Sequence, residues 1–372
     1  MHSDKFLKLL EIINQVPTAD NCQPFSYTIN NNVLSVGYDP VIAAHPLNKD
    51  EVATYITIGI LLKYIKLTCH ALGIHPEINL NIIKLNKKSI ILTCLLTEDT
   101  DDNEVLYSID DLLYRYTDRN NFKENKPKER ESISEFISSR GDSANVKSYY
   151  CRKASNRFLS FVAKNDLLLF SWSETFSKLL EWVRFSKRDI AETKDGLDYR
   201  NLGCQYFETR LLKLLWHSPF LRALFIKLKL YASAYLKQFF VLRNSKEFLL
   251  ITSKGKTLDS LVESGELICE TWIYLNKIGV STQPMNASAL LFWRRLALGD
   301  TNSLSGNAEK RVSLFLQRYA AEFSLEESEY PVFLFRIGRA NAFPREHRSL
   351  RKKSNCCLKL KSDIPIVEIQ AM

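Results

Sequence analysis

Arginine, threonine and arginine alternate in the segment Arg115-Tyr116-Thr117-Asp118-Arg119, a pattern that could hold a phosphate group. A guanidinium group is always charged and presents a planar fork of donors, so it binds phosphate oxygens through charge-assisted, often bidentate hydrogen bonds. The hydroxyl of Thr117 between the two cations could add a further bond. Taken alone, such a pattern usually marks a solvated basic turn, so its meaning depends on the other polar segments of the chain.

Basic residues are concentrated in two further places. Residues 336–353 hold seven basic residues against one acid, Glu346, and residues 210–246 hold eight basic residues and no acid. The whole chain carries a net charge of +9, from 51 basic and 42 acidic residues. Because the excess of basic residues lies in two clusters, we expect each cluster to contact an anionic group, and we expect no nucleic-acid partner. The basic residues of the C-terminal cluster are Arg336, Arg339, Arg345, Arg348, Arg351, Lys352 and Lys353.

A polar loop near the N-terminus reads PTADNCQPF, residues 17–25. It follows an apolar helical segment and precedes two predicted strands on either side of an asparagine-rich turn at residues 30–32. Its short polar side chains and exposed backbone could line a ligand. The alternative interpretation is a connecting loop held together by Asx-turn hydrogen bonds.

Two segments about 206 residues apart share a helical pattern. In each, one glycine (Gly59, Gly265) precedes a second glycine (Gly73, Gly279) by fourteen residues, and a proline follows within five. The first segment is apolar on nearly every face and is expected to be deeply buried. The second has an apolar stripe at positions 258, 261, 262, 268, 272 and 275. The closing glycine of each suits the left-handed residue that ends a helix.

The sequence contains no pattern typical of a metal site, a common catalytic motif, a signal peptide or a transmembrane helix. The eight cysteines are scattered without a CxxC pair, and with six dispersed histidines no zinc-ligand spacing occurs, so no metal site is predicted. No nucleophile pairing, paired-carboxylate motif, P-loop or GxGxxG is apparent, and no catalytic residue is assigned. No signal peptide is recognised, and no run approaches the roughly 20 apolar residues that span a bilayer. The chain is therefore expected in the cytoplasm with reduced thiols.

Taken together, these segments resemble the nitroreductase family, whose members bind FMN between two subunits. Residues 17–25 resemble the family's P-S-S-x-N-x-Q-P-W loop, with Thr18 replacing a serine, Ala19 losing a hydroxyl and Phe25 replacing a tryptophan. Residues 115–119 resemble its R-x-S-x-R/K motif, and residues 330–353 its closing strand and later basic pair. The resemblance implies FMN contacts at Pro17, Thr18, Asn21, Gln23, Arg115, Thr117, Arg119, Arg348 and Arg351, with Arg339 and Lys352 as further matches.

The order of these segments is reversed relative to an ordinary family member, in which the arginine motif comes first. The reversal implies a tandem, two-lobed chain that supplies both halves of one site. The implied fold is α+β, with two lobes of mainly antiparallel sheet wrapped by helices and related as a pseudo-dimer. The first lobe spans residues 1–104 and the second residues 105–372, including an insert at about 140–250 and the basic C-terminal segment.

The insert has three interpretations: a lid over the flavin, a surface that contacts anionic lipid, or scaffold. The implied function is an FMN-dependent oxidoreductase, a monomer, with NAD(P)H as one candidate electron donor. The basic insert would suit an anionic substrate, either a small molecule or a carrier-linked group. Two alternatives stay open: a non-catalytic flavin-holding protein, and a flavin-free basic interaction protein.

Overall fold

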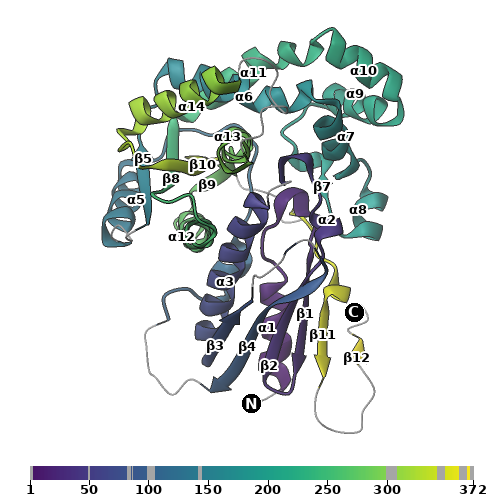
Figure 1. Ribbon diagram of the computed structural model, residues 1–372, viewed down its shortest axis with the longest axis vertical. Coiled ribbons are helices and arrows are strands. Elements are labelled where there is room, and N and C mark those ends of the chain that lie inside the picture. Colours follow the sequence, from purple (N-terminus) through teal and green to yellow (C-terminus); the bar gives the residue numbers. More distant parts are fainter. Residues whose placement is uncertain are drawn as a thin grey trace.

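Two sheets separated by a pair of long helices form the core of the protein. The computed structural model describes residues 3–48, 51–81, 85, 87–98, 105–140, 145–298, 308–341, 348–359 and 367–368 (Figure 1). In Figure 1 a six-stranded sheet occupies the lower part of the view and a four-stranded sheet the upper part, with helices α3 and α12 between them. The predicted α+β fold with mainly antiparallel sheets is confirmed.

The six-stranded sheet has the order β12-β11-β1-β2-β4-β3 and is antiparallel except for the pair β1–β11. The predicted hairpin at the asparagine-rich turn is confirmed, because β1 and β2 pair from Phe25 with Tyr38 to Asn30 with Val33. Strand β11, from the segment assigned to the second lobe, pairs with β1 of the first lobe. The strands are β1 Phe25–Asn30, β2 Val33–Tyr38, β3 Ile74–Leu80, β4 Ser89–Glu98, β11 Cys356–Lys359 and β12 Val367–Glu368.

The four-stranded sheet has the order β5-β8-β10-β9 and is antiparallel throughout. Its central strands are buried along almost their whole length, although they include the polar residues Glu247, Thr252, Ser253 and Arg336. Strand β5 lies inside the segment predicted as an insert, yet it forms an edge of this sheet. The strands are β5 Val146–Cys151, β8 Glu247–Ser253, β9 Ser281–Pro284 and β10 Tyr330–Gly338, and a separate parallel pair consists of β6 Val183–Arg184 and β7 Leu197–Asp198.

Helices pack on both sheets and form the upper rim of the molecule in Figure 1. Helix α6 packs on α11, α13 and α14 in the main core, whereas α7, α9 and α10 enclose a separate, smaller cluster centred on Phe176, Leu180 and Leu215. The helices are α1 Ser3–Ile13, α2 Pro40–Ala43, α3 Val52–Ala71, α4 Ile109–Tyr114, α5 Pro127–Arg140, α6 Asn156–Leu168, α7 Ser173–Glu181, α8 Lys187–Thr193, α9 Tyr206–His217, α10 Pro219–Lys227, α11 Ala234–Ser245, α12 Leu258–Lys277, α13 Ala287–Leu298 and α14 Ala308–Phe323.

Helices α3 and α12 cross in backbone contact at the two glycines that the repeat placed in equivalent positions. A Cβ atom added to Gly59 would lie 1.9 Å from the carbonyl oxygen of Val262, and one added to Gly265 would lie 2.1 Å from that of Ile56. No side chain fits at either position, so glycine is required there. Beside the crossing, Lys63 forms a 2.8 Å ion pair with Glu270.

The ends and faces of these two helices agree with the sequence pattern. Gly73 and Gly279, one after each helix, have φ values of +63° and +80°, which confirms the predicted left-handed ends. The predicted stripe of α12 is buried except at its first position, Leu258, which is 49% exposed.

By length and composition alone, α3 could cross a bilayer, although its sequence has no uninterrupted apolar run of that length. Its mean hydropathy is 1.4, and 72% of the stretch is buried within the protein. Thr57, Lys63 and Lys66 interrupt the apolar run in the sequence. Its packing against α1 and α12 is that of a core helix.

Candidate functional site

A cavity of about 370 Å³ lies where the polar loop, the N-terminal half of α3, the RxTxR segment and the start of α13 meet. Its size is within the range of small-molecule and cofactor sites. Eight of the eleven residues implied by the resemblance line it, although they come from three distant parts of the chain: Pro17, Thr18, Asn21, Arg115, Thr117, Arg119, Arg348 and Arg351.

Arginine dominates the electrostatics of this cavity. Among the described residues that line it, four are arginines and Asp20 is the single carboxylate. The guanidinium groups of Arg115 and Arg351 are neighbours, because each donates from Nη2 to the carbonyl oxygen of Gln15 at 3.4 Å. Arg348 packs against two aromatic rings, 4.8 Å from that of Tyr114 and 5.1 Å from that of Tyr116.

Burial and the neighbouring positive charges lower the pKa values of the clustered arginines. Burial, followed by the neighbouring charge of Arg115, lowers the pKa of Arg351 to about 10. Burial is also the largest cause lowering the pKa of Arg115, and the charge of Arg348 adds to it. The Nε atoms of Arg115 and Arg351 are buried and have no hydrogen-bond partner among the described residues. An anion placed among these guanidinium groups would offset their mutual repulsion.

The polar loop is held in an unusual backbone conformation. Asp20, Asn21 and Gln23 all have positive φ, between +49° and +56°. Asn21 Nδ2 donates to the carbonyl oxygens of Gly196 and Leu350, both at 3.1 Å. The Gln23 backbone amide donates to the Thr18 hydroxyl oxygen at 3.1 Å. Left-handed conformations of this kind are costly and persist where surrounding contacts fix them, as these contacts do.

Helix α12 and strand β9 position the RxTxR segment. The backbone amide of Tyr116 donates to Asn276 Oδ1, and its carbonyl oxygen accepts from Trp272 Nε1, both at 2.9 Å. The Asp118 amide donates to the carbonyl oxygen of Thr282 at 2.9 Å. The Arg115 guanidinium lies 4.6 Å from the centre of the Trp272 ring, a cation–π arrangement. Trp272 and Asn276 fix this segment, but the sequence marked Trp272 only as part of the apolar stripe.

The segment DGLDYRNLG, residues 195–203, had no assigned role in the sequence and packs against the RxTxR segment. Arg119 Nη1 donates to the Asn201 carbonyl oxygen at 3.3 Å, and Asn201 Nδ2 donates to that of Thr117 at 3.3 Å. Gly203 has φ +69°, and a Cβ there would lie 2.7 Å from the Arg119 carbonyl oxygen. The insert therefore contributes directly to one wall of the cavity.

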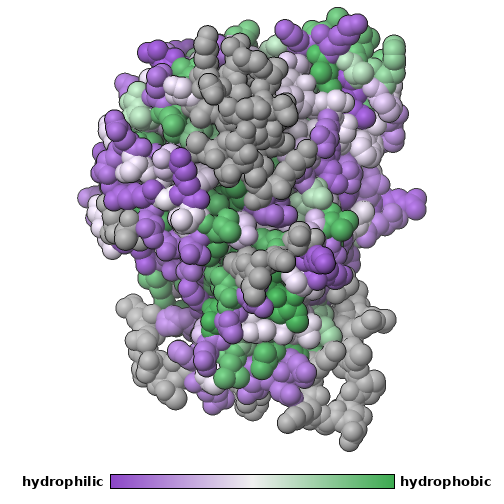
Figure 2. Space-filling view, in the orientation of Figure 1, coloured by the Kyte–Doolittle hydropathy of each residue, from purple (hydrophilic) through white to green (hydrophobic). Residues whose placement is uncertain are grey.

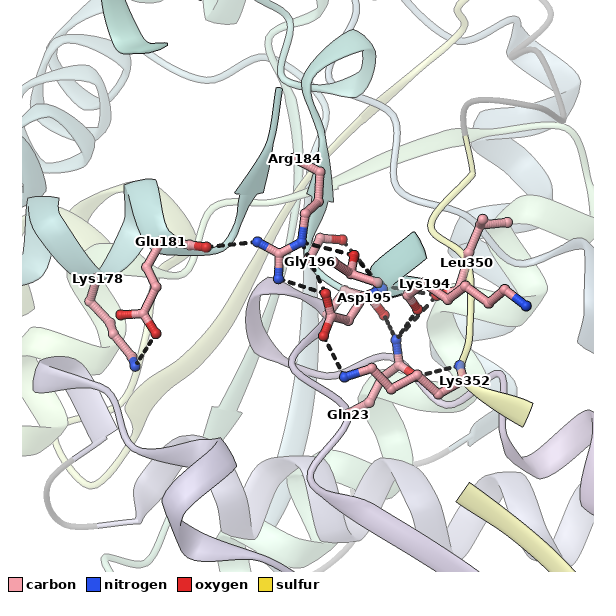
Figure 3. A network of polar contacts seen from close by, with 11 residues as sticks. Gln23, Lys178, Glu181, Arg184, Lys194, Asp195, Gly196, Leu350 and Lys352 are labelled. Carbon is pink, nitrogen blue, oxygen red and sulfur yellow. Dashed lines mark hydrogen bonds and ion pairs between the residues drawn. The ribbon is translucent and has the colours of Figure 1, made fainter. Parts of the chain in front are cut away.

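Three of the eleven residues do not line the cavity. Gln23 and Lys352 belong to a polar network behind the loop, in which Lys352 Nζ lies 2.5 Å from Asp195 Oδ2 (Figure 3). The Gln23 side chain donates to the carbonyl oxygen of Lys194 at 2.8 Å and accepts from the Lys352 amide at 2.9 Å. Arg339 lies elsewhere, where Nε donates to the carbonyl oxygen of Glu124 at 3.0 Å.

The network in Figure 3 joins the loop, the insert and the C-terminal segment. Arg184 Nη2 lies 2.6 Å from Asp195 Oδ1, so Asp195 is shared by two cations. Burial alone would raise the pKa of Asp195, but the hydrogen bonds from Lys352 and Arg184 lower it below its ordinary value. Gln23, Lys352 and Asp195 thus hold the cavity wall in place from outside.

Two titratable side chains that the sequence did not single out also line the cavity. Asp20 Oδ2 and His45 Nε2 are 3.9 Å apart. Burial is the largest cause in both cases: it raises the pKa of Asp20 and lowers that of His45. The uncharged form of each group is therefore favoured, and the pair can hold a proton at the edge of the cavity.

The cavity thiol has the character of a structural cysteine. Burial raises the pKa of Cys22 to about 12, so its thiolate is scarce at neutral pH. The described residues contain no group of three or more His, Cys, Asp or Glu side chains placed to hold a metal ion. The chemistry that this site supports is therefore the binding of an anion beside an apolar and aromatic surface that includes Phe25, Trp272 and Phe333.

No protein-family profile and no curated protein sequence matches the chain. Among solved structures, it is similar to the crystal structure of a protein from Anabaena variabilis that is provisionally assigned as a nitroreductase. The superposition covers 92% of this chain and 74% of the other, with a TM-score of 0.41 and 8% sequence identity.

Proposed function

We propose that this chain binds FMN in the arginine-lined cavity and acts as an oxidoreductase of the nitroreductase type. The observation that carries the proposal is the cluster of Arg115, Arg348 and Arg351 beside the polar loop, with Asp20 as the single carboxylate among the described lining residues. A buried group of like charges favours a bound anion, and a phosphate accepts the forked hydrogen bonds that guanidinium groups donate.

The residues present fit FMN in three respects. Arg115 and Arg351 line the cavity, where their positive charges could face the phosphate. Thr18 presents a hydroxyl group at the cavity wall, suited to the hydroxyl groups of a ribityl chain. Trp272 and Phe333 offer apolar surface for a planar ring.

When bound, FMN would supply the electron-transfer chemistry, and the protein would bind, orient and enclose it. Arg115, Arg348 and Arg351 would neutralise the phosphate. The Asp20–His45 pair would hold a proton at the cavity edge. The insert would act as the lid, since Thr175 and Leu179 of α7 and Asn201 line the wall opposite α3. NAD(P)H as electron donor and an anionic substrate, either a small molecule or a carrier-linked group, are part of the proposal.

The test compares FMN with riboflavin, which lacks the phosphate, by quenching of flavin fluorescence. We expect FMN to bind more tightly, by roughly tenfold to a hundredfold for each charge-assisted contact used. The Arg115→Met variant keeps the stacking on Trp272 and removes the charge. It should lose most of the advantage of FMN over riboflavin and bind riboflavin nearly as the native protein does.

The matched control is Arg339→Met, which removes a partly exposed arginine outside the cavity. It should preserve the preference for FMN. Equal affinities for FMN and riboflavin in the native protein would contradict the phosphate assignment. Tight FMN binding without oxidation of NADH or NADPH, and without re-oxidation by acceptors, would instead identify a flavin-holding protein.

A further inference from the structure

A group of exposed apolar side chains covers helices α9, α10 and α11. Of the 23 large hydrophobic residues exposed in the described part of the chain, ten fall between residues 206 and 240. Phe220 is 75% exposed, Phe207 64% and Leu236 61%. In Figure 2 apolar and charged side chains alternate over this region, at the upper right of the molecule. Such a concentration marks an interaction surface, because single exposed leucines are otherwise scattered.

The exposed residues follow the helical repeat, so each helix carries them along one stripe. We call these three stripes the outer face. The inner sides of α9 and α10 are already used, because Leu215 and Phe225 pack with Phe176 in the smaller core cluster. These helices are therefore apolar on two sides, and the core explains only one of them. The outer face consists of Phe207, Leu211 and Leu214 on α9, Phe220, Leu224 and Leu228 at α10, and Leu236 and Phe240 on α11.

The charges within residues 209–246, which carry most of the outer face, have one sign. No acidic residue occurs between Thr209 and Lys246, whereas eight basic residues do. Lys213, Lys227 and Lys229 are exposed beside the apolar stripes. The Lys237 side chain pairs with Glu208 at the start of α9, outside this acid-free stretch. A partner that binds the outer face would therefore need an anionic surface that also accepts apolar side chains.

We propose that the outer face docks on the surface of an anionic membrane. Helices that expose phenylalanine and leucine beside lysine and arginine insert their apolar side chains at the headgroup boundary, while the cations contact anionic lipid. Helix α7 contributes Thr175 and Leu179 to the cavity wall and packs on α9 and α10. Docking would thus place the insert side of the cavity toward the bilayer. This inference is independent of the identity of the cavity ligand.

The experiment is co-sedimentation of the full chain with two kinds of vesicle, one of phosphatidylcholine alone and one of phosphatidylcholine with phosphatidylserine at two to one. We expect strong binding to the anionic vesicles and weak binding to the neutral ones. The triple variant Lys213→Glu, Lys227→Glu, Lys229→Glu should lose binding by at least roughly fivefold for each lysine. The triple variant Phe207→Ser, Phe220→Ser, Leu236→Ser should lose it at unchanged charge.

Matched controls lie on the other end of the molecule. Ile90→Ser with Leu95→Ser removes exposed apolar residues of β4, and Lys87→Glu with Lys88→Glu reverses exposed charges next to it. Both should bind anionic vesicles like the native protein. Equal sedimentation with neutral and anionic vesicles, or native-like binding by the outer-face variants, would overturn the proposal. So would a dimer in sedimentation velocity that the apolar variant dissociates while vesicles go unbound, since the outer face would then join two copies.

Discussion

At the scale of single residues, the contacts of the cavity arginines differ, and the differences decide which arginine is best replaced in an experiment. Arg351 donates to the carbonyl oxygens of Gln15 and Val16 and contacts the Asn21 side chain, so its position is fixed by the loop it helps to hold. Arg115 has fewer protein partners and stacks on Trp272. Arg351 therefore helps to hold the loop in place, whereas Arg115 is the cleaner residue to replace when binding alone is measured.

A partly buried carboxylate in α6, Asp166, gives a prediction about pH. Burial raises the pKa of Asp166 from 3.8 to about 7, although Gln238 donates to its Oδ2 at 3.1 Å. In the folded state this group keeps its proton to a higher pH than when unfolded. Its contribution to stability is therefore full below pH 3.8 and is lost as pH rises towards 7.

The Asp166→Asn variant removes this titration and keeps an acceptor for Gln238. We expect it to be more stable than the native protein at pH 8, by roughly 2 kcal/mol, with the difference shrinking toward pH 4. Thermal unfolding of both proteins at pH 4, 6 and 8 measures this difference in stability. A stability difference that does not change with pH would show that Asp166 does not titrate in this range.

At the scale of elements, the crossing of α3 and α12 is the feature that tolerates least change. Gly59→Ala would place a methyl group 1.9 Å from the carbonyl oxygen of Val262, so the two helices would have to separate. We expect a loss of about 3 kcal/mol or more in the free energy of unfolding, because the clash is with backbone and cannot be relieved by a rotamer change.

The matched control is Gly255→Ala, where the added methyl group would lie 3.5 Å from the Ser260 hydroxyl oxygen, an ordinary contact. Its effect should stay within about 0.5 kcal/mol. Urea unfolding of the two variants measures the contrast. A Gly59→Ala protein as stable as the control would mean that the helices do not touch as described.

Elements defined by local pattern could be predicted from the sequence, and elements defined by distant pairing could not. The glycines at 59, 73, 265 and 279 marked two helices, and Gly73 and Gly279 marked their ends, because a left-handed residue there favours glycine. That the helices cross at Gly59 and Gly265 is visible only in the fold. Strand β11 is four residues long and pairs in parallel with β1, more than 300 positions away, so no local signal exists. Strand β5 inside the insert was missed for the same reason.

The candidate site shows the same division. The resemblance of three compact motifs to a known family implied eight residues that the fold brings to one cavity. Lys352 and Arg339 carry the same charge but pair with acidic groups or backbone elsewhere, and sequence alone does not separate the two cases. Asp20 and His45 meet only in the fold, 25 residues apart, and no spacing rule indicates them.

At the scale of the whole molecule, the cavity requires all three parts of the chain. Residues 17–25 come from the first half, residues 115–119 are held by α12 and β9, and Arg348 and Arg351 arrive with the C-terminal segment that continues into β11. The insert closes one side through α7 and residues 195–203. A ligand bound here would link these parts and stabilise the fold as a unit.

The most direct test of flavin binding is the visible absorption spectrum of the full chain after incubation with excess FMN and removal of the free flavin. We predict that the protein stays yellow, with flavin bands close to one equivalent per chain, and that a variant with both Arg115→Met and Arg348→Met is colourless while remaining folded by circular dichroism. A native protein that emerges colourless would contradict the account.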